Sequence, residues 1–146
     1  MTGTFSLAVH ALVYLNHKAS TLSSEALADN ICTNPARVRK VMAQLKRAGL
    51  IATKEGAEGG YSFHTDPKSV TLRQIADAVD ACFVSASWRP GDMDMECLVA
   101  SGMADIMDGI YASLDRVCRE QLDRTTIFDI DQRIFGKAGP KLESGK

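Results

Sequence analysis

The sequence has 146 residues, 45% of them hydrophobic, and its 17 Lys and Arg against 18 Asp and Glu give a net charge of -1. This length and composition predict one compact domain with an appendage, and no apolar run is long enough to cross a membrane. The N-terminus lacks the basic start and cleavage site of a signal peptide, so we expect a cytoplasmic protein with reduced cysteines.

The first predicted element is a helix over residues 5–15. Apolar side chains occur on nearly all of its sides, which is typical of a buried helix. His10 and His17 are seven residues apart and therefore share one face. Two histidines fall short of the three or four ligands that a protein zinc site uses, so we expect no metal site.

The stretch from Ser23 to Tyr61 organises the rest of the chain. It reads as a short helix after a capping serine, a turn, and a longer helix that begins at Asn34 with Pro35 in its first position and ends at Gly49. A Gly-rich turn and two short strands follow it. This order predicts a winged helix-turn-helix in a chain that is mainly α-helical with a small β-hairpin wing.

Positive charge is concentrated on the second helix of this motif. Between Ile31 and Lys54 there is no acidic residue, and the six basic ones are Arg37, Arg39, Lys40, Lys46, Arg47 and Lys54. DNA phosphates attract such a patch, and a helix of this size fits the major groove. The alternative is an ordinary solvated helix face. The patch together with the hairpin favours DNA binding.

The segment after the wing is expected to contain a helix over residues 72–81 and a loop over residues 84–96. The loop has no hydrophobic periodicity and contains the only tryptophan, Trp88. Trp88 either anchors the loop into the core, which we favour, or faces a ligand.

The longest helix is expected from Cys97 to Leu122. Its apolar residues recur near the 3.5-residue spacing of helices that pair with another helix. A homodimer through this helix would place two recognition helices about one DNA turn apart; the alternative is that the helix packs back on its own domain. Residues 92–131 hold ten acidic and three basic residues, so this part would repel DNA.

These patterns divide the chain into four parts. Residues 1–83 are expected to form the winged helix-turn-helix, residues 84–96 a loop, residues 97–135 the dimerisation helices, and residues 136–146 a disordered tail. The last of the dimerisation helices is a short one over residues 127–135, which Thr125 and Thr126 cap.

Four stretches of the chain resemble the Rrf2 family of bacterial winged-helix transcriptional regulators. They are residues 7–12, residues 24–28, residues 39–51, and the Gly-Gly-Tyr wing that continues to residues 70–75. The resemblance covers residues 5–135. It implies a dimer in which the long helix crosses to the partner subunit.

The resemblance also concerns a cofactor. Many Rrf2 proteins hold an iron–sulfur cluster on three cysteines that lie between the winged domain and the start of the long helix. Cys97 matches the last of these positions, but residues 83–96 contain no cysteine, and one thiolate cannot hold a cluster. We therefore expect a family member without an iron–sulfur cluster, in which a lone cysteine or a small molecule receives the signal.

Seven residues are expected to contact DNA. The N-terminal part of a recognition helix enters the groove first, which favours base contacts by Arg37, Arg39 and Lys40. Phosphate contacts are expected from Ser24, Asn34, Lys46 and Lys54. Cys97 is the candidate sensor: the helix dipole favours its thiolate and the neighbouring acidic residues oppose it, while a thiol packed in the dimer seam is the favoured alternative.

The predicted function is a homodimeric repressor that binds a double-stranded DNA operator and responds to a thiol-reactive or small-molecule signal. The alternative is a protein-interaction scaffold that uses the winged domain and the acidic helix without DNA. An enzyme is not expected, because the sequence has no recognisable nucleophile–base pair, phosphate-binding loop or metal set.

Overall fold

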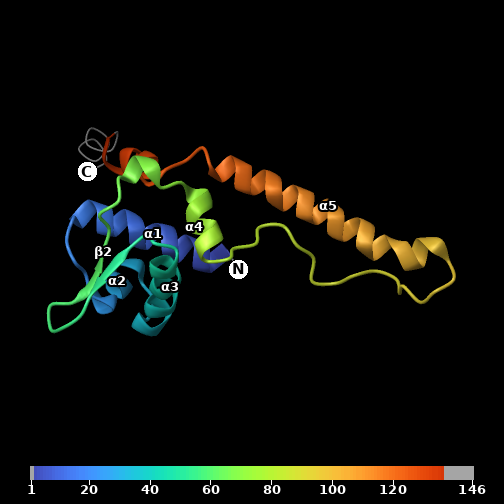
Figure 1. The fold of residues 1–146 in the computed structure, drawn as a ribbon, viewed down its shortest axis with the longest axis horizontal. Coiled ribbons are helices and arrows are strands. Elements are labelled where there is room, and N and C mark those ends of the chain that lie inside the picture. The colour runs from blue at the N-terminus through green and yellow to red at the C-terminus, as the bar shows by residue number, and fades with distance from the viewer. Residues whose placement is uncertain (1, 137–146) are drawn as a thin grey trace, which may run out of the picture.

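The computed structural model describes residues 2–136 and has the expected order of elements (Figure 1). Three helices are followed by a hairpin wing, in which Ala52 pairs with Ser62 and Lys54 with Gly60. The fold is therefore mainly α-helical with a small antiparallel wing. The elements are α1 (Thr2–Lys18), α2 (Ser24–Ile31), α3 (Pro35–Arg47), β1 (Ala52–Lys54), β2 (Gly60–Ser62), η1 (Pro67–Ser69), α4 (Leu72–Ala78), α5 (Leu98–Leu122), α6 (Ile127–Asp131) and η2 (Gln132–Gly136).

Helix α1 is the centre of the hydrophobic core. It contacts α2, α3, α4 and α6, and its Leu12 and Leu15 are fully buried. Ile127 of α6 is also fully buried in this core. Removal of such apolar side chains from water is the main force that holds the helices together. The C-terminal segment thus returns to pack on the first helix of the chain.

Local side-chain caps fix the starts of the two helices of the helix-turn-helix. The Ser23 Oγ accepts a hydrogen bond from the Ala26 N–H at 3.0 Å, and the Asn34 Oδ1 accepts one from the Arg37 N–H at 2.8 Å. Between them, Cys32 adopts a left-handed conformation (φ 65°) and ends α2. These bonds satisfy backbone donors that have no partner within the helix.

The wing is attached to the segment that precedes α2. Leu22 and Tyr61 exchange two backbone hydrogen bonds of 2.9 and 2.8 Å. Gly60 has a φ of 149°, and a Cβ at this position would lie 2.2 Å from the Leu22 carbonyl oxygen. Only glycine permits so close an approach of the two backbones. The hairpin and the start of α2 are therefore held as one unit.

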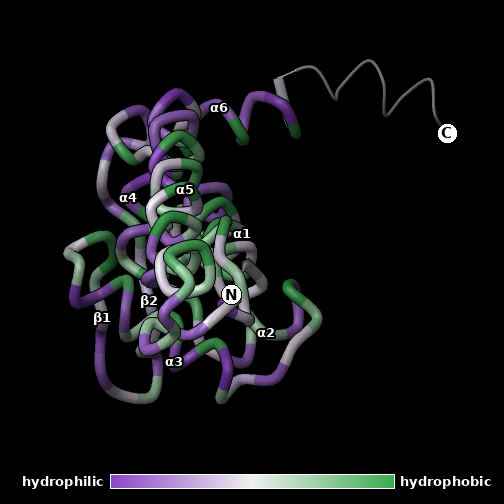
Figure 2. The backbone as a smooth tube through the Cα atoms, turned by 90° about the vertical axis from the view of Figure 1, so that its right-hand side faces the viewer, coloured by the Kyte–Doolittle hydropathy of each residue, from purple (hydrophilic) through white to green (hydrophobic). Residues whose placement is uncertain are grey.

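Helix α5 projects from this body (Figure 1). No residue of α5 is buried, and its main neighbour is α4. Hydrophobic positions recur around its turns (Figure 2). Its apolar residues Ile106, Ile110, Leu114 and Val117 remain 46% to 58% exposed. Within one chain, α5 does not pack back along its own domain.

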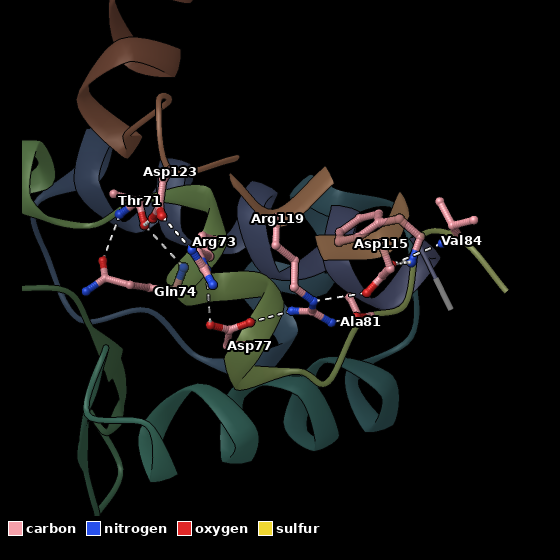
Figure 3. A network of polar contacts seen from close by, with 10 residues as sticks. Thr71, Arg73, Gln74, Asp77, Ala81, Val84, Asp115, Arg119 and Asp123 are labelled. Carbon is pink, nitrogen blue, oxygen red and sulfur yellow. Dashed lines mark hydrogen bonds and ion pairs between the residues drawn. The ribbon is translucent and has the colours of Figure 1, made fainter. Parts of the chain in front are cut away.

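A polar network fixes α5 to α4 (Figure 3). The Arg119 guanidinium donates to Asp77, to the Ala81 carbonyl and, at 3.2 Å, to Asp115. Asp115 in turn accepts the backbone N–H groups of Phe83 at 2.7 Å and Val84 at 3.1 Å. These contacts join the end of the winged domain to the last turns of α5.

The loop over residues 84–96 runs away from the core toward the start of α5 (Figure 1). Its Arg89 pairs with Asp105 at 3.0 Å and with Asp108 at 2.8 Å, both on α5. Trp88 is 74% exposed, so the expectation that it anchors the loop into the core is wrong. The loop lies along α5, and in the single chain no hydrophobic core is within reach of the Trp88 side chain there.

Several predicted boundaries differ from the structure: α1 spans Thr2–Lys18 rather than residues 5–15, and the helix predicted over residues 127–135 divides into α6 (Ile127–Asp131) and η2 (Gln132–Gly136). Helix α4 ends at Ala78 rather than at residue 81, because Asp80 has a positive φ of 52° and leaves the helical path. Except for Gly136, the predicted disordered tail lies outside the described residues. None of the helices over residues 2–136 combines the length and apolar character needed to cross a membrane.

Candidate nucleic-acid interface

The outer face of α3 is the candidate DNA-reading surface. The helix buries Val38, Val41, Met42 and Leu45 against the core. This leaves its other sides exposed, and they carry Arg37, Arg39, Lys40, Lys46 and Arg47. The helix carries no acidic residue. The arrangement presents several basic side chains and no acidic one of the helix itself on the exposed part of a rigid element.

Arg39 is held by two residues at the start of α2. Its Nη1 donates to the Ser24 Oγ at 3.2 Å and lies 3.7 Å from the Glu25 Oε2. The Ser24 Oγ also donates to the Glu25 Oε1 at 3.2 Å. Ser24 itself is buried, whereas the side chains of Arg39 and Glu25 are 53% and 68% exposed. The hydroxyl of Ser24 is therefore engaged within the chain.

The remaining candidate contacts occupy four different positions. Lys40 and Lys46 are exposed on α3, and Lys54 is exposed on β1 of the wing. Asn34 uses its side-chain oxygen as the cap of α3. Arg37 is exposed but directed toward α1, since its Nη2 would lie 3.1 Å from a Cβ placed at Gly3. Over residues 2–136, none of the three lysines forms an ion pair.

Cys97 lies away from this surface, at the N-cap of α5. Its thiol is exposed, and the backbone N–H groups of Ala100 and Val99 favour the thiolate and lower the pKa of Cys97. The sequence leaves the direction of this shift open, because the helix start and the acidic neighbours act in opposite senses. A thiolate is the reactive form of cysteine.

A cavity of about 620 Å³ lies between α1 and the C-terminal segment. It is lined mainly by apolar side chains, and the polar residues in its wall include His10 and His17. His10 Nε2 is 2.7 Å from the Asn30 Oδ1, and His17 stacks on Phe135 with ring centroids 4.2 Å apart. The sequence gives no sign of this cavity, because its walls come from opposite ends of the chain. The cavity at Trp88 is smaller, about 180 Å³.

Comparisons with known proteins agree with this geometry. A family model described as Rrf2, iron-dependent transcriptional regulator, matches residues 1–133. The chain belongs to the Rrf2 family. It is thus related to transcriptional regulators of the helix-turn-helix type. The four stretches of the sequence that resemble this family predicted the relationship.

Individual relatives are similar over nearly their whole length. The chain is 26% identical over 134 residues to YwnA of Bacillus subtilis (strain 168), which is named as an HTH-type transcriptional regulator, and the match covers 89% of this chain and 96% of that protein. A crystal structure of a transcriptional regulator from Lactobacillus plantarum has a TM-score of 0.80 at 23% identity, covering 99% and 97% of the two chains. The global cysteine regulator CymR of B. subtilis has a TM-score of 0.63 at 18% identity, covering 89% and 94%.

The family description raises the question of bound iron. A cluster needs a set of thiolate or similar ligands that converge on one point. Over residues 2–136, no three His, Cys, Asp or Glu side chains lie close enough to hold a metal ion. The donor set of a single chain, over the described residues, therefore does not fit a cluster.

Proposed function

We propose that the protein is a homodimeric repressor that binds double-stranded DNA sequence-specifically in the cytoplasm. The observation that carries this proposal is the outer side of α3, which is exposed and carries basic residues but no acidic one, while the opposite side is fixed in the core. A recognition helix needs these two properties, because it must enter the major groove and must be positioned rigidly by its own domain.

The exposed apolar side of α5 supports the homodimer. Ile106, Ile110, Leu114 and Val117 recur every three to four residues and lie on one side of the helix. A second copy of α5 packed against this side would remove these side chains from water. Two copies related by a two-fold axis would also present two α3 helices to one palindromic site.

The test is selection of duplex DNA from a random-sequence library by the full-length protein, followed by measurement of affinity. We expect enrichment of a sequence with two-fold symmetry. Lys40→Ala should weaken binding to the selected duplex, whereas Arg133→Ala, which removes a positive charge from the exposed surface of η2, should leave it unchanged. If no sequence is enriched, the proposal is overturned in favour of a scaffold that does not bind DNA.

Cys97 is proposed as the site that receives the signal. Its thiolate sulfur can attack a peroxide oxygen, which gives a sulfenic acid and releases hydroxide. The added oxygen lies at the first turn of α5, so the modification can alter how the two copies pair. We expect peroxide to change the affinity of the parent protein for its selected duplex but not that of Cys97→Ser. Equal responses from both proteins would direct attention to a small-molecule signal and the cavity along α1.

A further inference from the structure

We propose that Glu25 is a positioning residue for sequence recognition: it holds Arg39 in one orientation on the α3 surface and reduces the attraction of Arg39 for phosphate. The inference rests on the proposed function, because it concerns how the same surface selects its DNA.

The contacts around Arg39 restrain one edge of its guanidinium. Nη1 is 3.2 Å from the Ser24 Oγ and 3.7 Å from the Glu25 Oε2, and the Ser24 hydroxyl donates to the other Glu25 oxygen at 3.2 Å. Ser24 is buried in the first turn of α2, so its hydroxyl has a fixed position in the fold. Glu25, Ser24 and Arg39 thus form a closed set of contacts between α2 and α3.

The restrained arginine keeps donors for another partner. A guanidinium has five N–H groups in a planar fork, and the contacts to Ser24 and Glu25 use only Nη1. A bidentate contact to guanine requires two parallel donors, which the Nε and Nη2 edge supplies. Since Arg39 is about half exposed, that edge can be presented outward while the other is held.

The carboxylate also distinguishes Arg39 from its basic neighbours. Of the six basic residues between Ile31 and Lys54, Arg39 is the one with an acidic partner within 4 Å in the described part of the chain. Its unpaired neighbours attract any phosphate, whatever the sequence. The partly neutralised and oriented Arg39 contributes less to that general attraction and more to the choice between bases.

The test compares two duplexes of equal length: one selected from a random library by the parent protein, and one with the same bases in scrambled order. Glu25→Gln removes the charge but keeps the size of the side chain. It should free Arg39 to reach a phosphate, and one added phosphate contact corresponds to about fivefold in affinity at 0.15 M salt. We expect affinity for the scrambled duplex to rise by about this factor while affinity for the selected duplex changes less than about twofold.

Asp29→Asn is the matched control, because Asp29 is exposed one turn further along the same helix and has the same charge. It should change both affinities equally and leave their ratio intact. In an Arg39→Ala background, Glu25→Gln should no longer change the ratio. If Glu25→Gln alone leaves the ratio as it is in the parent, the inference is overturned and the proposed function stands. If the parent enriches no sequence at all, both fail.

Discussion

At the scale of single residues, the two basic side chains Arg39 and Lys46 differ in their surroundings. Arg39 is oriented by α2, whereas Lys46 stands exposed in the last turn of α3. An oriented planar donor is suited to a base edge, and a free ammonium on a flexible stem is suited to a phosphate. The two residues should therefore fail in different ways when they are removed.

Arg39→Ala should lose about 1–3 kcal/mol of binding free energy on the preferred sequence and relax base preference at one position. Lys46→Ala should weaken binding to all sequences alike and reduce the slope of log affinity against log salt by about 1. Titrations of both duplexes at several salt concentrations would check this. Identical behaviour of both variants and the parent would contradict the placement of α3 in the groove.

Asp115 is the residue whose titration should affect folding. Its carboxylate accepts the backbone N–H groups of Phe83 and Val84 and contacts Arg119, which together lower the pKa of Asp115 despite its partial burial. A lowered folded-state pKa means that the stabilisation is present above the unfolded value, about pH 3.9, and is lost as pH falls through the folded value.

We therefore expect the parent to lose stability below about pH 4 more steeply than Asp115→Asn, which cannot ionise. The variant should already be less stable at pH 7, because its amide replaces a carboxylate acceptor. Urea unfolding followed by circular dichroism between pH 3 and pH 7 measures both effects. Parallel pH profiles for the two proteins would show that this carboxylate does not contribute.

At the scale of elements, the sequence predicted where helices start better than it predicted which other elements each helix contacts. Ser23, Asn34 and Thr126 are caps whose partners lie within three residues, so the sequence contains the whole interaction. The contacts that join elements are not local in this sense. Arg119 meets Asp77 across 42 positions, and Arg39 meets Ser24 across 15.

The same distinction explains the error at Trp88. An aromatic side chain in a loop gains free energy by burial, which favours a core position. Whether a core is within reach depends on the course of the loop, and this loop is carried along α5 by Arg89 and by the hydrogen bond from the Asp92 N–H to the Ala100 carbonyl at 3.0 Å. No periodicity within residues 84–96 encodes that course.

The attachment of the wing to α2 gives a prediction at this scale. Gly60→Ala would place a Cβ 2.2 Å from the Leu22 carbonyl and would impose a φ that alanine avoids. The substitution should destabilise the protein by about 1–3 kcal/mol or separate the wing from α2. Gly109→Ala on α5 is the control, because a Cβ there meets nothing within 4 Å, and alanine should stabilise a helix by about 0.5–1 kcal/mol. Urea unfolding should show a lower free energy of unfolding than the parent for Gly60→Ala and a higher one for Gly109→Ala.

At the scale of the whole molecule, charge and hydrophobicity are separated between two parts. The winged domain carries the basic surface of α3, and α5 carries an apolar side within an acidic segment. One part is suited to a polyanion and the other to a second copy of the same helix. In the single chain both surfaces, the basic side of α3 and the apolar side of α5, remain exposed.

Ile110→Glu should disrupt a homodimer, because it places a charge in the middle of the exposed apolar side of α5. Sedimentation at micromolar concentration should show the parent as a dimer and the variant as a monomer. Binding to the selected duplex should weaken strongly in the variant, since each domain then binds without its tethered partner. Arg116→Glu, at an exposed position of the same helix, should change the charge without the same loss of assembly. A parent protein that sediments as a monomer would end this interpretation.

The way α5 is attached has a mechanical consequence. The helix has 25 residues and is fixed to α4 near its C-terminal end by Arg119 and Asp115. At 1.5 Å per residue, the part of α5 from Leu98 to Arg119 is a lever of about 32 Å. A rotation of about 10° at the Arg119 pivot moves the distant end by about 6 Å. This is more than one base-pair step of about 3.4 Å, so in the proposed dimer a small change of angle at one guanidinium would become a shift on the scale of the duplex that the two α3 helices read.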